Sequence, residues 1–202
     1  MTTKTLFFDL GGVLIDFSHE KMCTNIATLC DLDVTLVKCH LFEKNLSEMY
    51  ERGVIDSDTL YQYFQELSSK SFTYEELMEA ASTIFRVKEE MPPLLEGLKR
   101  QGIKLFLLSN TCHAHIQYAL AHFPFLQLFD GLILSYEVAA RKPEAEIFEA
   151  ALEKADATAS SSFFTDDVEM HVQGAKAVGI DAHHFEGKEG LVKALRERGI
   201  DA

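Results

Sequence analysis

Short apolar runs alternate with longer amphipathic stretches along most of this chain, and no other feature constrains its fold as strongly. The runs that predict strands are 6–8, 105–108, 132–134, 163–164 and 181–185. The first four are apolar on both faces, as a parallel sheet covered by helices on both sides requires. A half-exposed antiparallel sheet would instead alternate apolar and polar residues.

The stretches between the runs have apolar residues at helical spacing, as at Ile147, Ala151 and Ala155. Strand followed by helix, repeated, predicts right-handed crossovers and a doubly wound α/β sheet. At 202 residues the chain is long enough for one domain, or for one domain that carries an insertion.

One segment departs from this alternation. Residues 17–87 contain no convincing strand but several helical stripes, such as Leu60, Phe64 and Leu67. We therefore predict an α/β core made of residues 1–16 and 88–202, with residues 17–87 forming an inserted all-helical cap.

Charge and the N-terminal sequence narrow the partners and the compartment. Nineteen Lys and Arg against 32 Asp and Glu give a net charge of −13, which disfavours nucleic acid as a partner. The apolar run before Asp9 is too short for a signal peptide, and no stretch approaches the roughly 18 apolar residues of a membrane span. With four cysteines and no export signal, we expect a cytoplasmic protein with free thiols and no membrane partner. No motif bears on its oligomeric state.

Polar side chains follow four of the predicted strands. They are Asp9 after the first, Ser109 and Asn110 after the second, Lys142 in the loop after the third, and Asp166 and Asp167 after the fourth. In open α/β sheets, ligands bind beyond the carboxyl ends of the strands, so these loops are expected to converge on one crevice.

Together these residue types suit phosphoryl transfer. The Asp9 carboxylate, followed by two glycines, can attack phosphorus and form an aspartyl-phosphate that water then hydrolyses. Three clustered aspartates need a cation, and a site of oxygen ligands suits Mg²⁺. Ser109 and Asn110 can donate hydrogen bonds to phosphate oxygens, while Lys142 supplies a compensating positive charge.

Four segments resemble the motifs of the haloacid dehalogenase-like (HAD) hydrolase superfamily. They are FDLGGVL at 8–14, LLSNT at 107–111, RKPE at 141–144 and FTDD at 164–167. The resemblance covers the whole chain, because one large branch of that family carries a helical cap after the first motif. It implies a Rossmann-like core and a phosphatase-type activity with Mg²⁺ as the cofactor.

The resemblance also implies residue roles. Asp9 would be the nucleophile, with Ser109 and Lys142 completing the catalytic set. Metal ligation would fall to Asp9, the Gly11 carbonyl and Asp167, with Asp166 in support. The phosphate would be bound by Leu10, Gly11, Ser109, Asn110 and Lys142.

Gly11 departs from the family pattern. Family phosphatases usually have a second Asp there, which protonates the leaving group and then activates water, an effect worth about 10²- to 10⁴-fold in rate. Either another group donates the proton, or the leaving group needs none, or the protein is catalytically impaired. Asp16 is either a substitute donor or a hinge carboxylate, and His171 either orients the acidic pair or is an exposed helix residue.

The sequence favours a Mg²⁺-dependent phosphatase for a small phosphorylated metabolite, with sugar phosphates as one candidate class. One alternative is a haloacid dehalogenase-type hydrolase, which needs neither metal nor proton donor; the adjacent pair Asp166 and Asp167 argues against it. The other is a catalytically impaired phosphate-binding protein, to which Gly11 points.

Overall fold

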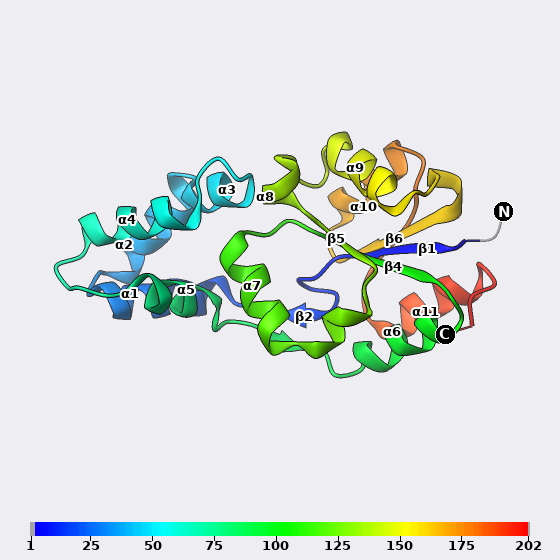
Figure 1. The fold of residues 1–202 in the computed structure, drawn as a ribbon, viewed down its shortest axis with the longest axis horizontal. Helices are drawn as coiled ribbons and strands as arrows, with labels where there is room; N and C mark the ends of the chain where they lie inside the picture. Colours follow the sequence, from blue (N-terminus) through cyan, green and yellow to red (C-terminus); the bar gives the residue numbers. More distant parts are fainter. Residues whose placement is uncertain (1–2, 202) are drawn as a thin grey trace.

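The computed structural model describes residues 3–201 and confirms the α/β fold (Figure 1). Five strands form one parallel sheet in the order β5-β4-β1-β6-β7. The strands are β1 (Thr5–Phe8), β4 (Lys104–Ser109), β5 (Gly131–Leu134), β6 (Ser162–Asp166) and β7 (Asp181–His184). Each of the five predicted runs therefore falls on a strand of this sheet.

Helices cover both faces of the sheet, α6 and α11 on one side and α9 and α10 on the other (Figure 1). Their bounds are Met91–Arg100 (α6), Ala145–Ala155 (α9), Glu169–Ala177 (α10) and Lys188–Arg196 (α11). Along β1, Leu6 and Phe8 are buried in the cluster that contains the α6 and α11 side chains, whereas Phe7 is buried in the cluster of α9 and α10. This alternation explains why the strand is apolar at every position.

Four further elements complete the core. They are α7 (His113–His122), α8 (Ser135–Val138) and the 3₁₀ turns η2 (Pro124–Leu128) and η3 (Ala159–Ser161).

The inserted segment is helical, and Figure 1 shows its helices beyond one end of the sheet. They are α1 (His19–Cys30), α2 (Val34–Lys38), the π-helical turn η1 (Cys39–Glu43), α3 (Leu46–Glu51), α4 (Ser57–Leu67) and α5 (Tyr74–Ser82). Side chains from these helices form a hydrophobic cluster of their own, to which Cys112 and Ala114 at the start of α7 are added. The sequence signals of the helix starts are present: Ser18 and Asp56 cap α1 and α4, and Thr73 forms a capping box with Glu76.

The expectation that residues 17–87 contain no strand is wrong at the end of the segment. Strand β3 (Arg86–Val87) pairs antiparallel with β2 (Ile15–Asp16), so the chain enters and leaves the helical segment through one short ribbon. Two residues are too few to show a strand period, which is why the sequence pattern missed it. Asp16 lies on this ribbon, mostly exposed, and its carboxylate pairs with the Lys88 ammonium at 3.0 Å.

Helix α3 joins the helical segment to the core through polar contacts. The Arg52 guanidinium pairs with Glu144 at 2.6 Å, and the Tyr50 hydroxyl accepts a hydrogen bond from the Ala114 N–H at 3.0 Å. The Ser135 hydroxyl donates to the Glu51 carbonyl at 2.6 Å. The end of α3 is therefore held against the strand-end loops of the core.

Across residues 3–201, every helix is too short or too polar to reach from one side of a membrane to the other.

Packing of the helical segment can be tested with a matched pair of substitutions. Leu77 on α5 is fully buried, whereas Leu36 on α2 is 40% exposed. We expect Leu77→Ala to lower the free energy of unfolding by about 2–5 kcal/mol, because it leaves a cavity. Leu36→Ala should lower it by less than about 1 kcal/mol in the same denaturant titration. Equal losses would show that the cluster around Leu77 does not stabilise the fold.

Candidate active site

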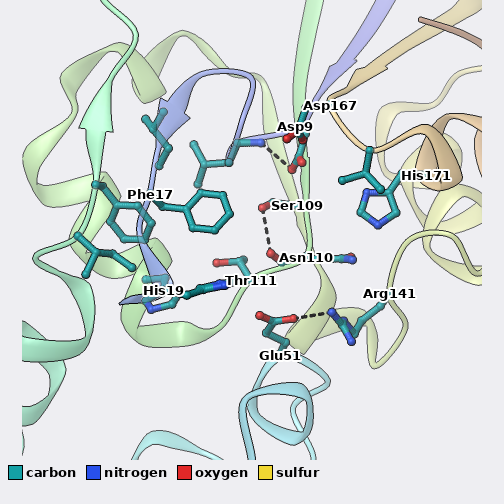
Figure 2. Close-up of a pocket in the computed structure, with 17 residues that line it drawn as sticks. Asp9, Phe17, His19, Glu51, Ser109, Asn110, Thr111, Arg141, Asp167 and His171 are labelled. Atoms are coloured by element: carbon teal, nitrogen blue, oxygen red, sulfur yellow. Dashed lines mark hydrogen bonds and ion pairs between the residues drawn. The ribbon is translucent and has the colours of Figure 1, made fainter. Parts of the chain in front are cut away.

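The strand-end loops enclose a cavity of about 270 Å³ with the helical segment (Figure 2). Asp9, Ser109 and Asp167 line it from the ends of β1, β4 and β6. Glu51 and Phe17 line it from the inserted segment and its junction with the core. The predicted convergence of polar loops at the carboxyl edge of the sheet is what the structure shows.

Asp9 lies at the end of β1, where the chain turns back on itself. The N–H groups of Leu14 and Ile15 both donate to the Leu10 carbonyl, and Gly12 takes a positive φ of 75°. Asp9 Oδ1 accepts hydrogen bonds from the Leu10 N–H at 2.7 Å and from Lys142 Nζ at 2.8 Å. Oδ2 has no such bond among the interactions of the described residues, so it is the oxygen available to a ligand.

Lys142 is the central cation of the site. Its side chain is completely buried, and Nζ lies 2.8 Å from Asp9 Oδ1 and 2.6 Å from Asp166 Oδ2. Burial alone would lower the pKa of this ammonium, but the two carboxylates raise it above its usual value, so Lys142 stays charged.

Asn110 holds the backbone of Lys142. Its Oδ1 accepts from the Lys142 N–H at 2.8 Å, and its Nδ2 donates to the Lys142 carbonyl at 3.0 Å. The phosphate contact predicted for Asn110 stays a prediction: Asn110 lines the cavity, and both ends of its amide also bond Lys142. Its side chain therefore positions the cation.

Asp166 is fully buried, and its two oxygens are occupied. Oδ2 binds Lys142, and Oδ1 accepts from the Val168 N–H at 2.8 Å and from His171 Nδ1 at 3.0 Å. Burial would raise the pKa of Asp166, but these partners hold it well below its usual value. Of the two possibilities for His171, the structure shows the one in which this side chain orients the acidic pair.

Asp167 lies beside Asp9 at one end of the cavity (Figure 2). Its carboxylate packs against Gly12 so closely that a Cβ on Gly12 would lie 2.1 Å from Asp167 Oδ2. Burial and the Asp166 charge both raise the pKa of Asp167. The glycine is required here both for its positive φ and for this close approach.

This arrangement fits a hard divalent cation. Burial raises the pKa of the Asp9 carboxyl to about 7, the Asp166 charge adds to the rise, and Lys142 opposes it. A cation bound between Asp9 and Asp167 would hold both ionised, and oxygen donors suit Mg²⁺. One set of potential ligand atoms, on Asp9, Asp166 and His171, lies within 4.8 Å of one another. Because the oxygens of Asp166 are already bonded, Asp167 is the better placed acidic partner for Asp9.

Ser109 ends β4 with its side chain nearly buried and facing the cavity (Figure 2). Its hydroxyl makes one long contact, 3.5 Å to the Asn110 carbonyl, which leaves it able to bond a ligand. The phosphate contact of Ser109 stays a prediction, and its hydroxyl lies where a ligand in the cavity can reach it. Leu10 contributes its N–H to Asp9 instead.

The space that a side chain at position 11 would take is filled by Phe17. A Cβ on Gly11 would lie 2.8 Å from Phe17 Cε1. Asp16, the alternative proton donor, lies outside the cavity lining. The Phe17 ring therefore occupies the space where an Asp at position 11 would lie.

Sequence reasoning missed part of the cavity wall. Phe17 and Glu51 carry no motif, and Arg141 was noted only as the residue before Lys142. The only signal for Phe17 was its position directly after the first motif, where the chain leaves the core.

A central parallel sheet with a carboxylate at the end of its first strand, a buried lysine and an acidic pair fits a hydrolase with a Rossmann-like α/β core. The haloacid dehalogenase-like hydrolase family matches residues 3–179, and the chain belongs to this family.

Named relatives narrow the class within the family. The chain is 28% identical over 198 residues to a sesquiterpene phosphatase of Aspergillus oryzae, covering 97% of this chain and 96% of that protein. It is 27% identical over 187 residues to a D-ribitol-5-phosphate phosphatase of Bacteroides thetaiotaomicron, covering 88% and 89%. The protein is therefore a HAD-type phosphatase.

Solved structures agree. A HAD family enzyme of Bacteroides thetaiotaomicron superposes with a TM-score of 0.85 at 27% identity, covering 97% of this chain and 100% of that one. Its complex with magnesium and inorganic phosphate gives a TM-score of 0.75 at 27% identity, covering 90% and 93%. Magnesium thus binds in the family to which this chain belongs.

The contact between Gly12 and Asp167 can be tested with a control that has the same backbone strain. Gly12 and Gly102 both have a φ of 75°, but a Cβ on Gly102 would meet nothing within 4 Å. Both alanine variants should lose about 1–2 kcal/mol of unfolding free energy through strain. Only Gly12→Ala should also raise the Mg²⁺ concentration for half-maximal activity, by about tenfold or more, because Asp167 must move. Equal Mg²⁺ requirements in the two variants would contradict the placement of Asp167.

Proposed function

We propose that this protein is a Mg²⁺-dependent phosphatase that cleaves a small phosphorylated metabolite through an aspartyl-phosphate intermediate. The observation that carries the proposal is the position of Asp9: its carboxylate lines the cavity, with one oxygen held by Lys142 and the other available. The magnesium and phosphate bound in the similar bacterial enzyme support it. So do the two relatives that are named as phosphatases of small molecules.

In the first step, Asp9 Oδ2 attacks the phosphorus atom and the bond from phosphorus to the leaving oxygen breaks; the leaving group departs as an oxyanion and takes its proton from water. Lys142 keeps the nucleophile oriented, and the Ser109 hydroxyl donates to a phosphate oxygen. In the second step, water attacks phosphorus, and phosphate leaves as the Asp9 carboxylate is regenerated.

Asp9, Asp167 and the Gly11 carbonyl are the groups that would hold Mg²⁺. Bound there, the ion would neutralise the repulsion between the carboxylate and the anionic phosphate. Asp166 acts through Lys142, which it keeps charged and in place.

Residues 17–87 act as the cap of a core made of residues 1–16 and 88–202. The cap supplies Phe17, His19, Glu51, Ile84 and Phe85 to the cavity lining. Since the core motifs contact only the phosphate, these residues select the leaving group and exclude bulk water.

The chemistry can be tested directly by phosphate release from p-nitrophenyl phosphate and from a panel of sugar phosphates, with and without Mg²⁺. We expect Mg²⁺-dependent release that Asp9→Asn lowers by at least about 10³-fold, because the nucleophile is lost. Asp16→Asn removes a carboxylate outside the cavity and should retain activity. Metal-independent halide release from a haloacid would instead support a dehalogenase. The absence of both activities would support a phosphate-binding protein without turnover.

Because Phe17 occupies the space of an acid at position 11, we expect kcat/KM to depend steeply on the pKa of the leaving group. No carboxylate stands at position 11 to protonate the departing oxygen, so kcat/KM should rise strongly as the pKa of the leaving phenol falls. A series of substituted phenyl phosphates measures this slope. Adding an acid while making room for it, as Gly11→Asp with Phe17→Ala, should flatten the slope, whereas Phe17→Ala alone should not. A flat dependence in the unaltered protein would sink this account.

A further inference from the structure

An ion pair faces the nucleophile from the far side of the cavity. Glu51, the last residue of α3, and Arg141, next to Lys142, are joined by a 2.8 Å contact between Oε2 and Nη2 (Figure 2). Both side chains line the cavity that contains Asp9. A second hollow of about 220 Å³ on α3 and η1 is also lined by Glu51 and Arg141, together with His19. The pair therefore separates two spaces that are open to a ligand.

The pair is largely buried, but its hydrogen-bonding capacity is not fully used. The Glu51 side chain is 19% exposed and that of Arg141 27%. Burial raises the pKa of Glu51, while Arg141 opposes the rise. Arg141 Nε is buried without a hydrogen-bond partner among the described residues. An acceptor that reached this guanidinium would satisfy a polar group that the fold leaves unpaired.

Joining α3 to the core does not account for this pair. The neighbouring contact of Arg52 with Glu144, at 2.6 Å, connects the same helix to the same loop, and neither of its residues lines the two cavities. Phe17, Ile84 and Phe85 also line the main cavity, and His19 and His115 pack against the two aromatic rings. A leaving group bound there therefore has aromatic and aliphatic side chains available, as well as a carboxylate with a guanidinium.

Hydroxyl groups match this wall better than the alternatives. A hydroxyl donates to Glu51 and accepts from Arg141, and the C–H groups of the same carbon chain can pack on Phe17. A second carboxylate on the leaving group would meet the Glu51 charge, and a plain alkyl chain would desolvate the ion pair without bonding it.

We propose that Glu51 and Arg141 form a hydroxyl-binding subsite that selects phosphate esters of neutral polyols or sugars over carboxylated and alkyl phosphates. The proposal rests on the phosphatase function proposed above and names the substrate class of the same cavity. Glu51 and Arg141 are specificity-determining residues in it, and Asp9 chemistry does not require them.

The test compares three primary esters of equal chain length: ribitol 5-phosphate, 5-phosphoribonate and n-pentyl phosphate. The leaving oxygen of a polyol phosphate is a somewhat better leaving group than that of pentyl phosphate. The test is therefore the change in the kcat/KM ratio that a substitution causes, and not the ratio in the unaltered protein. In Glu51→Gln, the kcat/KM ratio of ribitol phosphate to pentyl phosphate should fall about tenfold, mainly through KM. The ratio of the carboxylated ester to pentyl phosphate should rise about tenfold, because the repelling charge is gone.

Glu144→Gln is the matched control, because it breaks the other α3 ion pair and Glu144 lines neither cavity. Glu144 Oε2 also accepts from the Arg141 N–H at 3.0 Å, and the amide oxygen of Gln can still accept that bond. It should leave both ratios within about twofold, whereas equal shifts in this variant would overturn the subsite. If Glu51→Gln does not fold, Arg141→Lys keeps the charge but loses the planar fork, and the polyol ratio should fall in the same way.

Failure of this inference differs from failure of the proposed function. If the unaltered protein hydrolyses p-nitrophenyl phosphate with Mg²⁺ and the Glu51 and Arg141 variants leave the ratios unchanged, the subsite is overturned and the phosphatase stands. If it hydrolyses no phosphate ester, both are overturned.

Discussion

A buried ammonium between two buried carboxylates is the interaction on which this site depends. Lys142 Nζ lies within 2.8 Å of Asp9 and Asp166, and its backbone is fixed by Asn110. Neither carboxylate could remain ionised so deep in the core without that charge, and removing one member of such a set leaves an uncompensated buried ion. Three loops far apart in the sequence are thus fixed relative to one another by one cation.

The loop after β1 shows how the nucleophile was made accessible. Gly12 lets Asp167 approach the backbone, and Gly11 leaves the space that the Phe17 ring occupies. Gly12 therefore serves the proposed metal site. At Gly11 the chain has no acidic side chain, and the Phe17 ring forms an apolar wall there instead. The inserted segment supplies a further part of the cavity lining, and in the function proposed above the strand-end residues carry the chemistry while the insertion selects the leaving group.

Much of this was predictable because it rests on local patterns. Four apolar runs and the stretch 181–185 located the five strands of the parallel sheet, and the strand ends or the loops after them included Asp9, Lys142 and Asp166. The ribbon of β2 and β3 was missed because two residues have no period. The Asn110 contact with Lys142 joins two core loops that lie 32 positions apart, and the pairing of Glu51 with Arg141 joins the insertion to the core. Both contacts depend on how distant segments pack together, which no local spacing encodes.

In the proposed reaction, Asp9 becomes covalently phosphorylated. This intermediate can be detected by quenching the protein in acid during turnover of p-nitrophenyl phosphate with Mg²⁺ and locating the phosphoryl group by peptide mass spectrometry. We predict one phosphoryl group on the peptide that contains Asp9, and none in Asp9→Asn. Steady turnover with the label on a different residue would contradict the account.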